Sequence, residues 1–435
     1  MDSKTVDEIT LAGLLSKTPL DSKERGVVYT ILNSQGYNTV QRLRESTEWK
    51  NLVNKYVQEQ ISLRLQDSGG VEFSPIRIFV SGRALFFMED EHKTYINQGK
   101  SDFDTVMCQK EKDVLLPGVT MPFIQMCCQL NKGATTPYFD IHLITEISGT
   151  ALKRVYYSLG EYGITDVKVK GYEQIVSSTT ASVGAGGIPT IQASSSSSLS
   201  SSSLQTVPLL SLVSSGSSGS SKVIYENTFN RILVQQPDLF IGADINKVRI
   251  ALAHGIPAAL VTPKETPKNM MVTKSTCLNL AFDYDNCLVD DQSEINWNLL
   301  QNETSTVRLY KYWNQEYSKR YNLQKEGNLL SFLLKLTQLR NILPNSVFLS
   351  LITARNRKAC FRVMNTLDSF GVDFDVYTFG IFDKAKALES LQRPIHMFFD
   401  DQRSTVDKVS NVFPAARVPA GVTNISTERC SSELS

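Results

Sequence analysis

Short apolar runs alternate with helix-patterned stretches along the C-terminal half of the chain. The segments expected to be strands are LNLAFDYDNCLV, SVFLSLITA, FDVYTFG and IHMFFDD. Between them, the region from Ser293 to Leu343, the segment RKACFRVMNTLDSF and a short stretch from Lys384 have helical spacing. Nearly continuous apolar strands separated by amphipathic helices predict an α/β fold with a parallel sheet covered on both faces.

The N-terminal half shows a similar alternation. IRIFVSGRALFF, from Ile76 to Phe87, is expected to form one buried strand, and FDIHLIT, from Phe139 to Thr145, a second. MPFIQMCCQLN between them is helical in pattern, and VKVKGY follows a further helix. PDLFIGADINKVRIALAHGIPAALV predicts a strand, a turn, a helix and a strand. This half is therefore also expected to be α/β.

Two segments depart from this alternation. Residues 1 to about 70 are polar with apolar positions three and four apart, which predicts a small helical module. This module either binds a protein partner or packs on the main body as an extension. The tract from about Ser177 to Ser221 is dominated by serine. It cannot bury enough apolar surface to offset its ordering entropy, so we expect a disordered insertion, with an inert loop favoured over a phosphorylated one.

An internal repeat relates the two halves. In both, LIT is followed without gaps by an arginine, a leucine and a glycine at matching distances: Arg154, Leu159 and Gly163 in one, Arg362, Leu367 and Gly371 in the other. IFVSGRALFF resembles LAFDYDNCLV, and GIPAALV resembles VFPAARV. Ser81 and Arg83 then stand where the second half has Asp283 and Asp285. Two unrelated strand–helix–strand units that look alike are the alternative explanation.

The predicted organisation follows from these boundaries. We expect a helical module over residues 1–70, a degenerate α/β lobe over 71–270 containing the serine tract, a catalytic lobe over 271–425 and a tail over 426–435. If the repeat is real, one lobe keeps its carboxylates and the other has lost them. The first lobe would then shape, cap or regulate the second.

Composition narrows the class of protein. Hydrophobic residues make up 41% of the chain and charged residues 20%, as in ordinary globular domains. The formal net charge of +1 argues against broad attraction to nucleic acid or an anionic membrane. No apolar run approaches a membrane span, and MDSKTVDEITLAG does not resemble a secretory signal. The cysteines are odd in number and lack CxxC spacing, which indicates free thiols in a reducing compartment, most simply the cytoplasm.

Polar residues suited to phosphate follow the strands of the second half. In chain order they are Asp283 and Asp285, then Thr353 with Arg355 just beyond it, then Lys384 at a helix start, and finally Asp400 and Asp401. Ligands of open parallel sheets bind beyond the carboxyl ends of the strands. Carboxylates there suit Mg²⁺, while a hydroxyl and an ammonium balance phosphoryl oxygens. Two aspartates separated by one residue are weak evidence alone. The whole ordered set predicts a phosphatase site in which one carboxylate is the nucleophile and another transfers protons.

Other polar residues have simpler explanations. Asp290 and Asp291 fit a solvated turn, and Glu294 fits a helix start, where the helix dipole favours it. Histidines inside apolar strands are more often core residues than catalytic ones, and a cysteine within a strand is more often packed than reactive. These readings apply to His142, His396 and Cys287. Arg355 either reaches a substrate phosphate or pairs with Asp401.

The sequence resembles the cytosolic 5′-nucleotidase type I family of the haloacid dehalogenase-like phosphatase superfamily. The motifs that carry the resemblance are AFDYDNCLVDDQSE, SLITAR, IHMFFDDQ and VPAGV in the second half, with VSGRALF, LPGVTMPF, FDIHLIT and LFIGADINKVRIALAHGIPAA in the first. Coverage runs from about Ile76 to Val422 and excludes the serine tract. The resemblance implies Mg²⁺-dependent hydrolysis of nucleoside 5′-monophosphates, AMP-like in the animal members.

The resemblance also implies roles for the strand-end residues. Asp283 would be the nucleophile, Asp285 the general acid and base, Thr353 a phosphoryl ligand and Lys384 a stabilising cation. Asp400 or Asp401 would bind Mg²⁺ beside Asp283 and the backbone carbonyl of Asp285. Lys386 could substitute for Lys384, because the spacing to the last strand is one residue longer than usual. Tyr284, Asn286 and Cys287 depart from the smaller residues typical of the family, which puts pocket shape and base preference in question.

The expected function is a cytosolic 5′-nucleotidase that releases nucleoside and phosphate. One alternative is a phosphatase of the same fold acting on another small phosphomonoester. Another is a non-catalytic nucleotide-binding scaffold, against which the intact set of aspartates, threonine and lysine argues. The preferred base and sugar, allosteric effectors and homo-oligomerisation are left open by the sequence.

Overall fold

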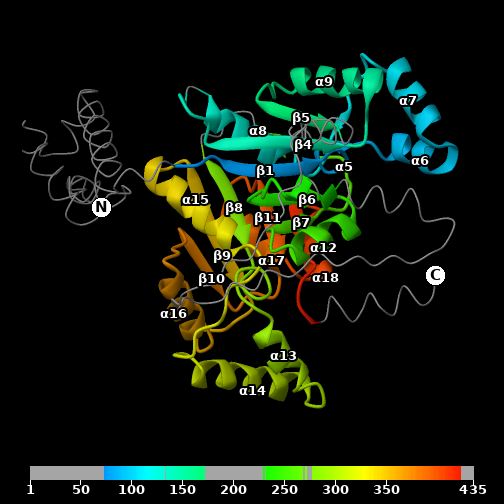
Figure 1. Ribbon diagram of the computed structural model, residues 1–435. Helices are drawn as coiled ribbons and strands as arrows, with labels where there is room; N and C mark the ends of the chain where they lie inside the picture. The colour runs from blue at the N-terminus through cyan, green and yellow to red at the C-terminus, as the bar shows by residue number, and fades with distance from the viewer. Residues whose placement is uncertain are drawn as a thin grey trace, which may run out of the picture.

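The apolar runs of both halves pair into a single ten-stranded sheet, drawn in Figure 1. The structure is a computed structural model that describes residues 73–171 except 133, and residues 229–422 except 231, 268–269 and 272–276. The predicted helical module, the serine tract and the tail lie outside the described residues. Neighbouring strands of the large sheet are parallel at every pairing except that of β12 with β7. The α/β fold predicted from the sequence is therefore present.

The first half contains the elements up to residue 260. They are β1 (Ile76–Ser81), α5 (Gly82–Leu85), β2 (Phe86–Phe87), α6 (Glu89–Gln98), α7 (Lys100–Gln109), β3 (Leu116–Pro117), α8 (Met121–Asn131), β4 (Phe139–Thr145), the 3₁₀ turn η1 (Gly149–Ala151), α9 (Leu152–Glu161), β5 (Val167–Gly171), β6 (Leu239–Gly242), α12 (Ile245–Ala253) and β7 (Ala258–Leu260). Strands β2 and β3 form a separate two-stranded sheet.

The second half begins with the strand that carries Asp283 at its end. Its elements are β8 (Leu278–Phe282), α13 (Gln292–Asn298), α14 (Ser305–Ser318), α15 (Leu330–Ile342), β9 (Val347–Thr353), α16 (Cys360–Phe370), β10 (Val376–Phe379), α17 (Lys384–Ser390), β11 (Met397–Asp400), α18 (Arg403–Val409) and β12 (Ala415–Arg417). Helices α13 and α14 project from the sheet at the lower end of Figure 1.

The strand order repeats between the halves. The sheet reads β10-β9-β8-β11-β12 and then, reversed, β7-β6-β1-β4-β5. Pairing registers match as well: Val80 lies opposite Leu143 in the first half, and Phe282 lies opposite Leu351 in the second. Ser81 and Asp283 therefore occupy equivalent positions, as the sequence comparison proposed. Because β12 and β7 meet antiparallel, the carboxyl ends of the two sets of strands point to opposite edges of the sheet.

Helices bury both faces of the sheet. Side chains alternate along each strand. In β8, Leu278, Leu280 and Phe282 join a core that also contains residues of α8, α9, α15 and α16. Ala281, on the other face, packs with residues of α17 and α18. Since the first core cluster contains strand residues of both halves, it binds them into one folded unit.

Two predicted strands are shorter than their apolar runs. The run from Ile76 to Phe87 was predicted as one strand, but a helical turn over α5 interrupts it. The turn places Ala84 and Leu85 in the core, and the chain then pairs with β3 instead of the main sheet. Strand β8 ends at Phe282, so placing Cys287 within the strand was wrong: it lies in the following turn, where it is fully buried. In both places the apolar run continues past the strand because the turn that follows is also buried.

Candidate active site

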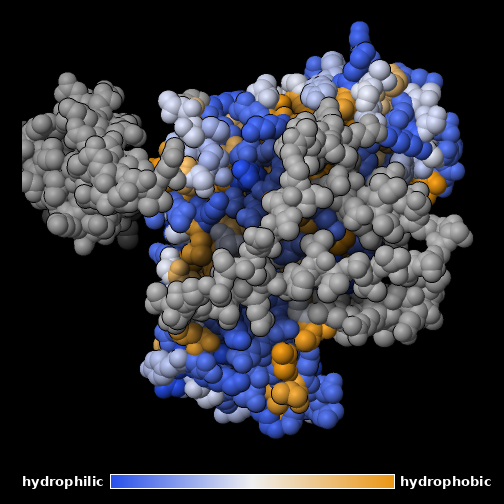
Figure 2. Space-filling view, viewed as in Figure 1, coloured by the Kyte–Doolittle hydropathy of each residue, from blue (hydrophilic) through white to orange (hydrophobic). Residues whose placement is uncertain are grey.

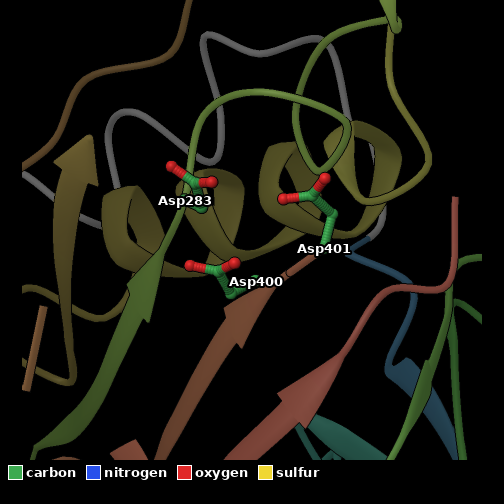
Figure 3. Close-up of side chains that lie close together, drawn as sticks. All are labelled: Asp283, Asp400 and Asp401. Atoms are coloured by element: carbon green, nitrogen blue, oxygen red, sulfur yellow. The ribbon is translucent and has the colours of Figure 1, made fainter. Parts of the chain in front are cut away.

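Three buried aspartates meet at the carboxyl ends of β8 and β11 (Figure 3). The two strands are neighbours in the sheet, and Asp283 N donates a 2.8 Å hydrogen bond to the carbonyl of Phe399. This contact brings Asp283 beside Asp400 and Asp401, whose carboxylates point toward it. One oxygen from each of the three side chains lies within 4.8 Å of the others. The side chain of Asp285 is not part of this cluster.

Lys384 joins the cluster from the start of α17. Its Nζ lies 2.8 Å from Asp283 Oδ1 and 2.7 Å from Asp400 Oδ2, and the residue is buried. Lys386, considered as a substitute, has a side chain 81% exposed and pairs with Asp383. The structure thus brings Lys384 to the aspartates and leaves Lys386 at the surface.

The cluster carries more negative than positive charge. When all three carboxylates are ionised, they outnumber the one ammonium and leave an excess of two negative charges among these four side chains. Burial, with Asp400 nearby, raises the pKa of Asp283, although Lys384 opposes this, and burial beside Asp400 and Asp283 raises the pKa of Asp401. Burial disfavours the charge of Lys384, but Asp283 and Asp400 outweigh it and raise its pKa. An all-oxygen donor set with this excess charge fits a divalent cation.

Thr353 ends β9, the strand next to β8. It is almost fully buried, and its Oγ1 accepts a 3.3 Å hydrogen bond from the backbone N–H of Arg355. The hydroxyl hydrogen remains available to donate. Thr353 therefore lies one strand away from Asp283, at the same edge of the sheet.

Asp285 is held by Arg355 instead of the aspartate cluster. Arg355 Nη2 lies 2.6 Å from Asp285 Oδ1, and Nε lies 3.1 Å from Oδ2. The other guanidinium nitrogen donates to Glu316 of α14 at 2.8 Å, and Arg362 donates to the same oxygen at 3.0 Å. The pairing of Arg355 with Asp401 considered from the sequence was wrong. Burial opposes the charge of Arg355, but Asp285 outweighs it and raises its pKa.

Asn286 supports the aspartate cluster from the loop after β8. Its Nδ2 donates to Asp401 Oδ2 at 2.7 Å and to Glu294 Oε2 at 3.0 Å. The residue has a positive φ of 57°, which asparagine tolerates better than most residues. The sequence marked Asn286 only as a family departure and Glu294 only as a helix-start residue. Asn286 bonds Glu294 eight residues away and Asp401 115 residues away, and the second contact could not be revealed by local pattern.

The simpler sequence interpretations hold for several other residues. Burial, followed by the neighbouring carboxylates, raises the pKa of the Cys287 thiol well above its usual value, so it is not a reactive thiolate. His396 is buried and its Nδ1 accepts a 2.8 Å hydrogen bond from Asn279 N. Asp291 precedes α13 without a side-chain capping bond, and neither it nor Asp290 belongs to the aspartate cluster. Both residues are half-buried and one carboxylate oxygen of Asp290 is buried, so the solvated turn expected from the sequence was wrong.

A largely parallel sheet with aspartates on two strand tips, a lysine shared between them and a helical insertion after the first of those strands defines the haloacid dehalogenase-like class. Comparison with protein families agrees: a family model described as 5′-nucleotidase matches residues 72–170 and 216–425, and the chain belongs to this family. It is therefore a phosphomonoesterase that hydrolyses nucleotide 5′-phosphates. No solved structure matches the chain. Among the described helices, none combines the length and apolar content needed to cross a bilayer.

Proposed function

We propose that this protein hydrolyses nucleoside 5′-monophosphates such as AMP, using Mg²⁺, and acts in the cytoplasm. The observation that supports this most directly is the buried group of Asp283, Asp400 and Asp401 joined to Lys384. Membership of the 5′-nucleotidase family supports a nucleotide as the substrate. The oxygen donors with their excess negative charge suit a hard divalent ion.

In the proposed reaction, a carboxylate oxygen of Asp283 attacks the phosphorus atom and the bond from phosphorus to the 5′ oxygen breaks. The leaving oxygen takes a proton from Asp285, which yields the nucleoside and an aspartyl-phosphate. Water then attacks the phosphorus atom, gives its proton to Asp285 and releases phosphate, which restores Asp283. Lys384 and the Thr353 hydroxyl offset the charge on the phosphoryl oxygens.

Asp283, Asp400, Asp401 and the backbone carbonyl of Asp285 are the proposed Mg²⁺ ligands. The ion would supply positive charge to the phosphoryl oxygens and allow the anionic substrate to approach the carboxylates. Asn286 fixes the orientation of Asp401, and Gln402 N donates to Asp400 Oδ1 at 2.8 Å. These contacts hold the donor oxygens in place before the ion arrives.

Proton transfer requires a movement of Asp285. Both of its oxygens accept hydrogen bonds from Arg355 in the structure. We propose that the Asp285–Arg355 pair opens as substrate binds, so that the carboxyl group turns toward the 5′ oxygen. Arg355 either remains on Glu316 or follows toward the substrate phosphate.

The test is phosphate release from a panel of nucleoside monophosphates, with and without Mg²⁺. We expect turnover of at least one monophosphate that EDTA abolishes, and a loss of about 10³-fold or more in Asp283→Asn. Asp291→Asn is the matched control, because it lies in the same loop without a side-chain capping bond, and should retain activity. Sugar phosphates in the panel test the other phosphomonoester alternative. No turnover of any nucleoside monophosphate would refute the proposal.

A further inference from the structure

A cavity of about 380 Å³ lies in the first half, at the carboxyl ends of its strands. Its floor is made by residues at and just after the carboxyl ends of β1, β4 and β6, and its wall by α6 and α7, which lie at the upper right of Figure 1. All of its lining residues lie between Ser81 and Lys247. Because the two sets of strands point to opposite edges, the cavity is separate from the aspartate cluster. Its volume falls in the range of small-molecule pockets, about 300–1,000 Å³.

The cavity occupies the position in the first half that the aspartate cluster occupies in the second. Ladder registers equate Val80 with Phe282, and Ile241 with Phe399. Both halves also insert a helical segment after the equivalent first strand, α6 and α7 in one and α13 and α14 in the other. Each half therefore has a strand-end floor and a helical insertion beside it, and only the chemistry of the floor differs.

The floor of the first-half cavity has no carboxylate at the positions that match the aspartates of the second half. Counting along the strands from the matched pairs, Ser81 and Arg83 replace Asp283 and Asp285, and Gly242 and Ala243 replace Asp400 and Asp401. The hydroxyl is kept, since Thr145 of β4 matches Thr353 of β9 and lines the cavity. At these matched positions, an anion entering the second half meets carboxylates and needs a metal ion, whereas an anion entering the first half meets hydroxyls and a guanidinium.

The remaining walls combine cations with aromatic surface. Arg83, Lys100 and Lys247 line the cavity, against the carboxylates of Glu146 and Asp244. Arg83 Nη2 forms an ion pair with Glu89 Oε1 at 2.8 Å, and Lys247 forms one with Glu146. Tyr95 and Phe103 contribute rings 5.8 Å apart at an interplanar angle of 86°. Aromatic rings next to cations suit a molecule with an aromatic body and a phosphate.

We propose that this cavity binds a nucleoside monophosphate without a metal ion and without hydrolysing it. The phosphate lies on Ser81, Thr145 and Arg83 and competes with Glu89 and Glu146 for their cations, while the base lies against Tyr95 and Phe103. The choice of a nucleoside body rests on the proposed function, because it assumes that the matched sites take related ligands. Ser81 in place of a carboxylate nucleophile, and Arg83 in place of the proton carrier, leave the bound ester intact.

The experiment measures binding of radiolabelled AMP to the full chain in EDTA by equilibrium dialysis, with chromatography to verify that AMP stays intact. We expect a single saturable site per chain. Arg83→Gln and Lys247→Gln should each raise Kd about tenfold or more, because each removes a charged contact. Lys384→Met alters only the other site and should leave this binding unchanged. Lys153→Gln is the surface control, an exposed lysine of α9 paired with Glu111.

Several results would overturn the proposal. They are no AMP binding in EDTA, binding that both cavity variants leave unchanged in correctly folded protein, and inorganic phosphate binding as tightly as AMP. Circular dichroism melting of each variant identifies those that fail to fold. A chain that binds AMP here but turns over no monophosphate would refute the proposed function and leave this site standing. Turnover of a nucleoside monophosphate without AMP binding in EDTA would refute this site and leave the proposed function standing.

Discussion

At the scale of single residues, the two lysines of α17 differ in burial and in contacts. Lys384 bridges Asp283 and Asp400, while Lys386 is exposed beside Asp383. Lys384→Met removes the ammonium from the carboxylates and the phosphoryl group, so we expect kcat to fall about 10²–10³-fold. Lys386→Met should change kcat by less than about twofold. Steady-state phosphate release at saturating Mg²⁺ measures both, and a larger loss in Lys386→Met would contradict the assignment.

A second single-residue prediction concerns whether Arg355 binds substrate or positions Asp285. Its guanidinium reaches Asp285 and Glu316 at once, a geometry that an ammonium cannot reproduce. If it acts through Asp285, Arg355→Lys should lower kcat about tenfold or more while KM changes little. A rise in KM with kcat preserved would instead indicate contact with the substrate phosphate.

Arg362→Lys is the matched control for Arg355→Lys. Arg362 is equally buried and donates to the same Glu316 oxygen, but its other nitrogens donate to Asn322 and Gln292, not Asp285. Both substitutions disturb the Glu316 network and should lower stability alike. Only the one at Arg355 should carry the additional loss in kcat, and equal losses would show that the network acts on the fold alone.

At the scale of elements, the loop after β12 supports the loop after β8. Gly421 has a φ of 86°, and a Cβ built on it comes within 2.7 Å of Asn286 Nδ2 and collides with the Glu294 carboxylate. Gly421→Ala should therefore displace Asn286 from Asp401. Loss of such a supporting contact lowers metal affinity about 10–100-fold, so the Mg²⁺ concentration for half-maximal activity should rise by about tenfold.

Gly371→Ala separates this effect from backbone strain. Gly371 ends α16 with a φ of 68°, and a Cβ there meets no atom within 4 Å. It imposes a similar left-handed penalty of about 1 kcal/mol without touching the site. Titration of activity with Mg²⁺ compares the two variants, and a matching shift in both would mean that Asn286 does not tune the metal site.

Elements and strand ends were predictable because each follows from a local pattern. The segment MPFIQMCCQLN is helix α8, and FDIHLIT is strand β4, as their apolar spacing indicated. Parallel topology then placed Asp283 near Asp400 without knowledge of any side-chain conformation. The partners of Asp285 and Asp401 were not predictable, since Arg355, itself held by Glu316 of α14, and Asn286 reach them from separate loops. The cavity under α6 and α7 also depends on packing between segments.

Apolar residues at the end of α13 and on α14 are exposed to solvent. Leu299 is 76% exposed and Tyr310 63% exposed. An orange strip at the lower edge of Figure 2 lies over this part of the molecule. Single exposed apolar side chains are ordinary on protein surfaces. Their position on the projecting helices next to β8, and not on the sheet, leaves the core of the second half complete without them.

At the scale of the whole molecule, the two halves are joined edge to edge in one sheet, through β12 and β7. They share one core cluster, and their strands meet through the pairing of Arg417 with Leu260. We propose that they are related lobes divided near residue 271, one retaining catalytic carboxylates and one adapted to bind without them. Helix α8 contacts β8 and helix α15 contacts β1, so each lobe packs a helix on the other's strand. Such contacts make the stability of one lobe depend on the other.

The pH dependence of that shared stability provides the last prediction. Burial lowers the pKa of His396 to about 4 from its ordinary value of 6.5, with the bond from Asn279 N opposing the shift. Between these values the unfolded chain binds a proton that the folded chain does not. Stability is therefore fully present above pH 6.5 and falls as pH drops toward 4, by about 2 kcal/mol at pH 5 and about 3 kcal/mol in total.

His396→Gln keeps an acceptor for Asn279 N but cannot titrate. The free energy of unfolding in urea should therefore fall by about 2 kcal/mol less between pH 7.5 and pH 5 in His396→Gln than in the unmodified chain. His254→Gln, at an exposed position after α12, should keep the full dependence. Since His396 lies between β8 and β11, at the end of the strands opposite the aspartates, the comparison can be made in EDTA, where metal binding does not contribute. Equal pH dependence in all three proteins would show that acid acts on the fold through other groups.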